Sequence, residues 1–114
     1  MGQILLVEDH EVLHRFLCDA IEQAGHEADC VKTRREAELA LSSRHYDLLI
    51  SDLRLPDGSG HDLATTAVDR GTKIMLITGH PDEVTVLSDQ QVAQLEKPFS
   101  LDEFITLLES TLAR

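Results

Sequence analysis

The sequence predicts a single α/β domain in which helices cover both faces of a parallel sheet. Short apolar runs alternate with amphipathic helical segments five times along the 114 residues, which is the pattern of a doubly wound sheet. The apolar runs are nearly continuous, as expected of strands that are buried on both faces. We therefore expect one domain over residues 1–114, without repeats or linkers.

The first half of the chain supplies three expected strands and two expected helices. Strands are predicted at Gln3–Val7, Glu27–Val31 and residues 47–51. A helix is predicted at residues 11–24, with Gly25 as its C-terminal cap. Its apolar residues share one face and are Leu13, Phe16, Leu17, Ala20, Ile21 and Ala24. Thr33 and Glu36 match a capping box that opens a second helix, ending near Ser43.

The second half continues the alternation after a turn at residues 56–60. A third helix is expected to end near Asp69, and strands are expected at residues 73–77 and 92–95. Residues 81–89 could hold a short helix, although their pattern is poor. A second capping box at Ser100 and Glu103 opens the last helix. Its expected core residues are Leu101, Phe104, Ile105, Leu108 and Leu112.

The composition argues against a nucleic-acid or membrane partner. The chain has 10 basic and 21 acidic residues and a net charge of −11, so nucleic-acid phosphates and anionic lipids would repel it. No apolar run approaches the roughly 18 residues that cross a bilayer, and no signal peptide is visible. We therefore expect a cytoplasmic protein. Cys18 and Cys30 form no CxxC pair, and we expect both to be reduced packing residues.

Polar residues follow the predicted strands at the edge of the sheet where ligands bind in such folds. Glu8 and Asp9 follow the first strand, Asp52 the third, Thr78 the fourth and Lys97 the fifth. Three neighbouring carboxylates cannot all stay ionised without compensation. Because oxygen ligands suit Mg²⁺, we predict a magnesium site here, rather than a solvated acidic rim.

Together these residue types indicate phosphoryl transfer. A carboxylate can attack phosphorus and form an acyl phosphate, and Asp52 is the best candidate because it ends a central strand. Mg²⁺ neutralises charge on the transferred oxygens. The Thr78 hydroxyl and the Lys97 ammonium can bind phosphoryl oxygens.

Four segments resemble the receiver domains of two-component response regulators, of the chemotaxis-regulator or hybrid-kinase type: ILLVEDHE, DLLISDLRLPDGSG, KIMLITGH and LEKPFS. The resemblance spans essentially the whole chain. It implies a flavodoxin-like (βα)₅ fold with strand order 2-1-3-4-5. It also implies a phosphorelay role, in which a histidine kinase or phosphotransfer protein phosphorylates Asp52 and the domain changes its surface toward a downstream target or effector domain. Such a domain catalyses only its own phosphorylation and dephosphorylation.

The resemblance also assigns individual roles. It implies that Glu8, Asp9, Asp52 and the backbone carbonyl of Arg54 bind Mg²⁺. Thr78 matches the hydroxyl that moves toward the phosphoryl group, and Lys97 matches the lysine that pairs with it. The peptide bond between Lys97 and Pro98 is expected to be cis.

Three departures from the family pattern bear on signalling. Gln94 stands where receivers usually carry an aromatic residue, the stretch between Thr78 and Lys97 is short, and Arg54 and His80 occupy positions that tune phosphoryl lifetime. Burying the Gln94 amide without partners would cost about 1–3 kcal/mol. We therefore expect backbone movement within residues 79–94 to carry the response.

Three other interpretations compete with a phosphorylated receiver. Residues His10, Glu11 and His14 match the HExxH pattern of zinc proteases, but no third ligand is placed for a catalytic zinc. A dehalogenase-like phosphatase needs a second aspartate where Arg54 stands. A receiver fold could also serve as a scaffold, independent of phosphorylation.

The remaining histidines carry no such pattern. We expect His26, His45 and His61 to be surface residues at loops and helix ends.

Overall fold

The computed structural model describes residues 2–79 and 92–114. The strands are β1 (Gln3–Val7), β2 (Glu27–Val31), β3 (Leu48–Asp52), β4 (Arg54–Leu55), β5 (Gly58–Ser59), β6 (Lys73–Thr78) and β7 (Val92–Glu96). The helices are α1 (Glu11–Gln23), α2 (Arg34–Ser43), α3 (Gly60–Asp69) and α4 (Leu101–Leu112). The five long strands match the predicted ones to within one residue at each end.

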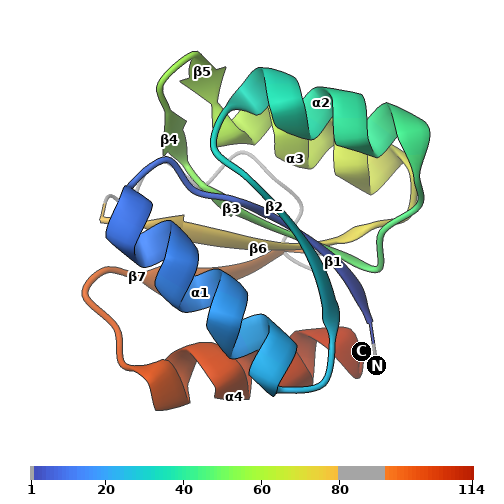
Figure 1. Cartoon of the computed structure of the whole chain (residues 1–114). Helices are drawn as coiled ribbons and strands as arrows, with labels where there is room; N and C mark the ends of the chain where they lie inside the picture. The colour runs from blue at the N-terminus through green and yellow to red at the C-terminus, as the bar shows by residue number, and fades with distance from the viewer. Residues whose placement is uncertain (1, 80–91) are drawn as a thin grey trace.

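Five parallel strands form one sheet in the order β2-β1-β3-β6-β7. Counting these five strands along the chain gives the order 2-1-3-4-5, as predicted. Figure 1 shows α2 and α3 on one face of the sheet and α1 and α4 on the other. The strand that follows β1 in the chain lies on one side of it, and the strands of this sheet that follow β3 lie on the other side. In such sheets the ligand crevice lies at the carboxyl ends of the two strands where the order reverses, here β1 and β3.

Alternate residues of each central strand face opposite helix layers. In β1, Leu5 and Val7 belong to the core that includes α2 and α3. Ile4 and Leu6 belong to the core that includes α1 and α4. All four are fully buried. The two-sided core explains why the strand sequences are continuously apolar.

The helix ends follow the capping signals. Thr33 and Ser100 accept hydrogen bonds from the backbone N–H groups of Glu36 and Glu103, and both capping boxes are complete. Gly25 follows α1 with a φ of 95°, a conformation that favours glycine.

Three predicted core residues are instead exposed. Phe16 on α1 is 46% exposed, and Leu101 at the start of α4 is 44% exposed. Ala24, just past α1, is also exposed. Helical periodicity identifies an apolar face, but the packing partner decides which part of that face is covered. Leu17 and Ile21 contact the core, whereas Phe16 lies at the rim of the same face.

The turn at residues 56–60 forms a small hairpin that the sequence does not predict. β4 and β5 pair antiparallel, with Arg54 opposite Ser59 and Leu55 opposite Gly58. Two-residue strands are too short for a recognisable pattern. Gly58 has a φ of 155°, and Ser59 caps α3 by accepting a hydrogen bond from the His61 N–H at 3.0 Å.

The expectation of two reduced cysteines is wrong for this structure. Cys18 on α1 and Cys30 on β2 are joined by a disulfide, and their Cα atoms are 6.3 Å apart. Both residues are half-buried. They meet because α1 packs against β2, and no cysteine motif in the sequence signals that tertiary contact.

His26 is not the surface residue that the sequence suggested. Its side chain is only 7% exposed, because it lies between the N-terminal segment and α4. Its Nδ1 accepts a hydrogen bond from the Gly2 N–H at 2.9 Å, so its Nε2–H donates to Glu109 at 2.7 Å. His45 is exposed as expected, and His61 is half-buried.

Two predictions lie outside the described residues. The possible helix at residues 81–89 falls there entirely, and so does most of the 79–94 segment that we expect to carry the response.

Candidate functional site

The carboxyl ends of four strands bring the predicted site residues together. Glu8 and Asp9 follow β1, Asp52 ends β3, Thr78 ends β6 and Lys97 follows β7. One carboxylate oxygen from each of the three acidic residues lies within 4.8 Å of the other two. Within residues 2–79 and 92–114, this is the group of metal-binding side chains close enough to share an ion.

Lys97 supplies the positive charge of the cluster. Its Nζ donates to Asp52 Oδ2 at 2.8 Å and lies 3.9 Å from Glu8 Oε1. Burial opposes the lysine charge, but the hydrogen bond and negative charge of Asp52, with smaller contributions from Glu8 and Asp9, hold the pKa of Lys97 above its ordinary value. The ammonium is therefore a fixed point charge beside the candidate nucleophile.

Glu8 is the most buried carboxylate of the cluster, with 1% exposure. Its Oε2 accepts a hydrogen bond from the His10 N–H at 3.0 Å. Its Oε1 has no hydrogen-bond donor within the described part of the chain. Burial, followed by the charges of Asp52 and Asp9, raises the pKa of Glu8 to about 7, although the His10 bond and Lys97 act in the opposite direction.

The donor set fits a hard divalent cation. A buried carboxylate oxygen that lacks a donor costs free energy, and a cation shared with Asp9 and Asp52 would remove that cost. Three carboxylates on one side, with one of them exposed to solvent, suit Mg²⁺, which keeps several waters when it binds to proteins. Glu8, Asp9 and Asp52 would hold the ion.

Thr78 is placed beside Asp52 by the sheet. The register pairs Asp52 with Ile77, the residue before Thr78. The Lys97 N–H donates to the Thr78 carbonyl at 2.9 Å, so the chain segments that carry both residues are adjacent. Thr78 is 1% exposed. The peptide bond between Lys97 and Pro98 is cis, as predicted.

Two neighbours of Asp52 were not recognised from the sequence as site residues. The Ser51 hydroxyl donates to the Asp52 carbonyl at 2.8 Å. A Cβ on Gly60 would lie 2.3 Å from the same carbonyl oxygen, so only glycine fits there. A glycine directly after a turn is a signal for such close backbone approach, whereas nothing in the sequence distinguishes Ser51.

Of the three positions that depart from the family pattern, the structure describes Arg54 and Gln94. The Arg54 N–H donates to Asp52 Oδ1 at 3.4 Å, so the backbone of Arg54 lies at the cluster, while its side chain is exposed. Gln94 is an exposed residue of β7, paired in register with Leu76. His80 lies outside the described residues.

The two histidines of the HExxH pattern make hydrogen bonds at the start of helix α1. His10 caps α1 and accepts a hydrogen bond from the Leu13 N–H at 3.4 Å. The His14 Nδ1–H donates to the Glu8 carbonyl at 2.9 Å. Neither histidine belongs to the metal-binding group found among the described residues, which argues against a zinc protease.

The response regulator receiver domain model matches residues 4–109. The chain belongs to the response regulator receiver family. Such domains act in two-component signalling, so this receiver domain is consistent with a phosphorelay.

Curated relatives differ in length. The response regulator receiver protein CpdR of Brucella abortus is 32% identical, and the match covers 98% of each chain. The virulence transcriptional regulatory protein PhoP of Salmonella typhimurium is 30% identical over this whole receiver domain but only 53% of its own length. The receiver domain thus spans about half of such regulators.

Solved receiver structures share the fold. The non-phosphorylated HemR receiver domain of Leptospira biflexa has a TM-score of 0.89 and 33% identity, covering 100% of this chain and 96% of that one. The response regulator TrrA of Thermotoga maritima, solved with Mg²⁺ and BeF, has a TM-score of 0.85 and 27% identity, covering 97% and 99%.

Proposed function

We propose that this receiver domain accepts a phosphoryl group on Asp52 from a histidine kinase or phosphotransfer protein, in a reaction that requires Mg²⁺. The observation that carries the proposal is the contact of Asp52 with Lys97 at 2.8 Å, beside a buried Glu8 oxygen that has no hydrogen-bond donor among the described residues. The TrrA complex with Mg²⁺ and BeF supports the choice of ion.

The chemistry follows from the positions of the side chains. A carboxylate oxygen of Asp52 attacks phosphorus, the bond between phosphorus and the donor histidine nitrogen breaks, and its electron pair returns to the imidazole, which takes up a proton. When bound, Mg²⁺ supplies charge neutralisation to the phosphoryl oxygens. Lys97 leaves Asp52 to pair with one of those oxygens, and the Thr78 hydroxyl donates to another.

An apolar patch beside the pocket offers a place for the phosphodonor protein. Leu13, Phe16, Lys97, Pro98 and Phe99 line a groove between α1 and the segment after β7. Because Lys97 contacts Asp52, this groove adjoins the reacting carboxylate, and a protein that brings its histidine to Asp52 can rest on it. Exposed apolar surface next to the reacting atoms suits a protein partner.

The remaining properties follow the same proposal. The domain catalyses only its own phosphorylation and dephosphorylation, acts in the cytoplasm and passes its signal to a downstream protein or effector domain. A net charge of −11 disfavours direct contact with nucleic acid. None of the helices in the described ranges could span a membrane.

The deciding experiment is incubation with Mg²⁺ and acetyl phosphate, followed by intact-mass analysis. We expect a gain of one phosphoryl group, lost on adding a chelator beforehand and absent in Asp52→Asn, because a carboxamide is a poor nucleophile. Asp47→Asn is the matched control, since Asp47 lies at the opposite end of β3 and accepts a hydrogen bond from the Gln3 N–H. It should label like the wild type.

Undiminished labelling of Asp52→Asn would contradict the assignment. An unlabelled wild type that still binds its partner would favour a scaffold that works without phosphorylation.

A further inference from the structure

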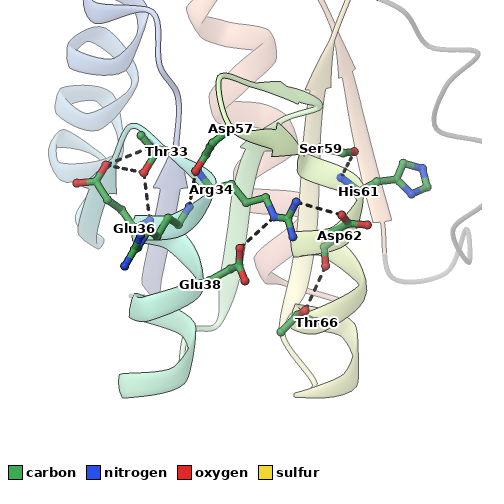
Figure 2. A network of polar contacts seen from close by, with 10 residues as sticks. Thr33, Arg34, Glu36, Glu38, Asp57, Ser59, His61, Asp62 and Thr66 are labelled. Carbon is green, nitrogen blue, oxygen red and sulfur yellow. Dashed lines mark hydrogen bonds and ion pairs between the residues drawn. The ribbon is translucent and has the colours of Figure 1, made fainter.

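The loop that follows Asp52 is fastened to the first turn of α2. Asp57, at the tip of the β4–β5 hairpin, accepts hydrogen bonds from the backbone N–H groups of Arg34 at 2.8 Å and Arg35 at 3.0 Å. Figure 2 shows the Asp57 carboxylate above this helix end, beside the Thr33 cap. Two segments 23 residues apart in sequence are thereby joined.

Asp57 completes the cap of α2. The first N–H groups of a helix have no partner within the helix. Thr33 satisfies the N–H of Glu36, and Asp57 satisfies two earlier ones. The bond from the Arg34 N–H is the main reason that the pKa of Asp57 lies below its usual value, and a carboxylate also suits the positive end of the helix dipole.

The Arg34 side chain lies against the hairpin. Its Nε donates to Glu38 at 3.0 Å and its Nη1 lies 3.3 Å from Asp62 on α3, as Figure 2 shows. The side chain lies so close to the hairpin that a Cβ on Gly58 would be 2.5 Å from Nη1. The hairpin therefore rests against both α2 and α3.

The same hairpin connects directly to the phosphoryl site. Leu53, the residue after Asp52, donates its N–H to the Ile77 carbonyl at 3.1 Å and accepts from the Gly60 N–H at 2.8 Å. Arg54, which donates to Asp52 Oδ1, pairs across the hairpin with Ser59. Arg54 is the first residue of the hairpin strand β4 and directly follows Leu53, so the hairpin begins next to these anchors.

We infer that Asp57 is a positioning residue for the metal site: its bonds to α2 hold the β4–β5 hairpin, and with it the Arg54 backbone, in register with Asp52. The inference rests on the proposed function, since it concerns the Mg²⁺ that Asp52 and the Arg54 carbonyl would bind. Partners of this kind, one layer removed from the ligands, affect metal affinity by orienting them.

The test compares Asp57→Ala with Thr33→Ala, using Mg²⁺ alone as the ligand in isothermal titration calorimetry. Both changes remove hydrogen bonds to the first turn of α2, so both should lower thermal stability to a similar degree. Only Asp57→Ala frees the hairpin. We expect it to weaken Mg²⁺ binding on the order of tenfold, and Thr33→Ala to leave the affinity within about twofold of wild type.

Two further readouts separate positioning from general destabilisation. Asp57→Asn keeps one of the two acceptor oxygens and should recover part of the Mg²⁺ affinity lost in Asp57→Ala. Amide exchange of Gly60 should accelerate in Asp57→Ala but not in Thr33→Ala, because its bond to the Leu53 carbonyl closes the loop that contains the hairpin.

Equal Mg²⁺ affinity in the two alanine variants, or slow exchange of Gly60 in both, would overturn the inference and leave the proposed function intact. A wild-type protein that binds no Mg²⁺ would overturn both.

Discussion

The environment of Glu8 strongly opposes the charge of its carboxylate. Its ordinary pKa of 4.5 is raised to about 7, chiefly by burial. Between pH 4.5 and 7, Glu8 is therefore protonated in the folded protein but ionised in the unfolded chain. The unfolding free energy of the metal-free protein falls as the pH rises through this range, because the folded state binds more protons than the unfolded state.

Glu8→Gln should remove this penalty. We expect the metal-free variant to be more stable than wild type at pH 8, by up to about 3 kcal/mol, and to match wild type well below pH 4.5, where Glu8 is protonated in both the folded and the unfolded state. Urea denaturation at several pH values with a chelator present measures the difference. If the difference in unfolding free energy between Glu8→Gln and wild type did not change with pH, Glu8 would not have the raised pKa described above.

Gly60 joins α3 to the backbone of the candidate nucleophile. Gly60→Ala would drive a Cβ to 2.3 Å from the Asp52 carbonyl, and we expect a loss of about 1–3 kcal/mol in unfolding free energy together with weaker labelling of Asp52. Gly79→Ala is the matched control, because among residues 2–79 and 92–114 no atom lies within 4 Å of its Cβ position, its chain neighbours aside. Equal stability of the two variants in chemical denaturation would contradict the packing argument.

Helix α1 presents exposed apolar residues beside the pocket. Phe16 is 46% exposed and lines the groove next to Lys97. We expect Phe16→Ser to slow transfer from a phosphorylated phosphotransfer protein by at least about fivefold, since removing a central interface contact costs more than ~1 kcal/mol. Transfer from acetyl phosphate, which needs no docking surface, should be unchanged.

Leu39 on α2 supplies the control for this comparison. It is 61% exposed and lies on the opposite face of the sheet, so Leu39→Ser should leave both reactions unaffected. Equal slowing by both variants, or slowing of acetyl phosphate transfer by Phe16→Ser, would argue against docking on α1.

The disulfide affects the stability of the molecule as a unit, because it ties α1 to the edge strand β2. Cys18 and Cys30 are 12 residues apart, and closing a loop of that size stabilises a fold by about 3 kcal/mol in the chain-entropy model. We expect added reductant to lower the unfolding free energy by about this amount. The double variant Cys18→Ser/Cys30→Ser should be insensitive to reductant.

Thiol titration provides the independent check. The oxidised, denatured protein should show no titratable thiol, and the reduced protein should show both. Two free thiols in protein prepared under oxidising conditions would refute the bond.

The alternation of apolar runs and amphipathic segments was enough to predict the sheet and its helices. Strand ends could be placed because a two-sided core demands continuous apolar residues, and the capping boxes at Thr33 and Ser100 mark helix starts through local hydrogen bonds. The cluster of Glu8, Asp9 and Asp52 was also predictable, since parallel strands place their carboxyl ends at one edge.

Contacts between segments far apart in sequence were decided by tertiary structure alone. Cys18 meets Cys30 and His26 is enclosed by α4 because helices pack across the sheet, and helical periodicity does not specify which part of a face is covered. The capping of α2 by Asp57 leaves no local pattern, because its donors lie more than twenty residues away. Hydrogen bonds between residues close in sequence can be predicted from the local pattern of residue types. The partner of a buried or capping side chain from a distant segment depends instead on how the helices and the sheet pack together.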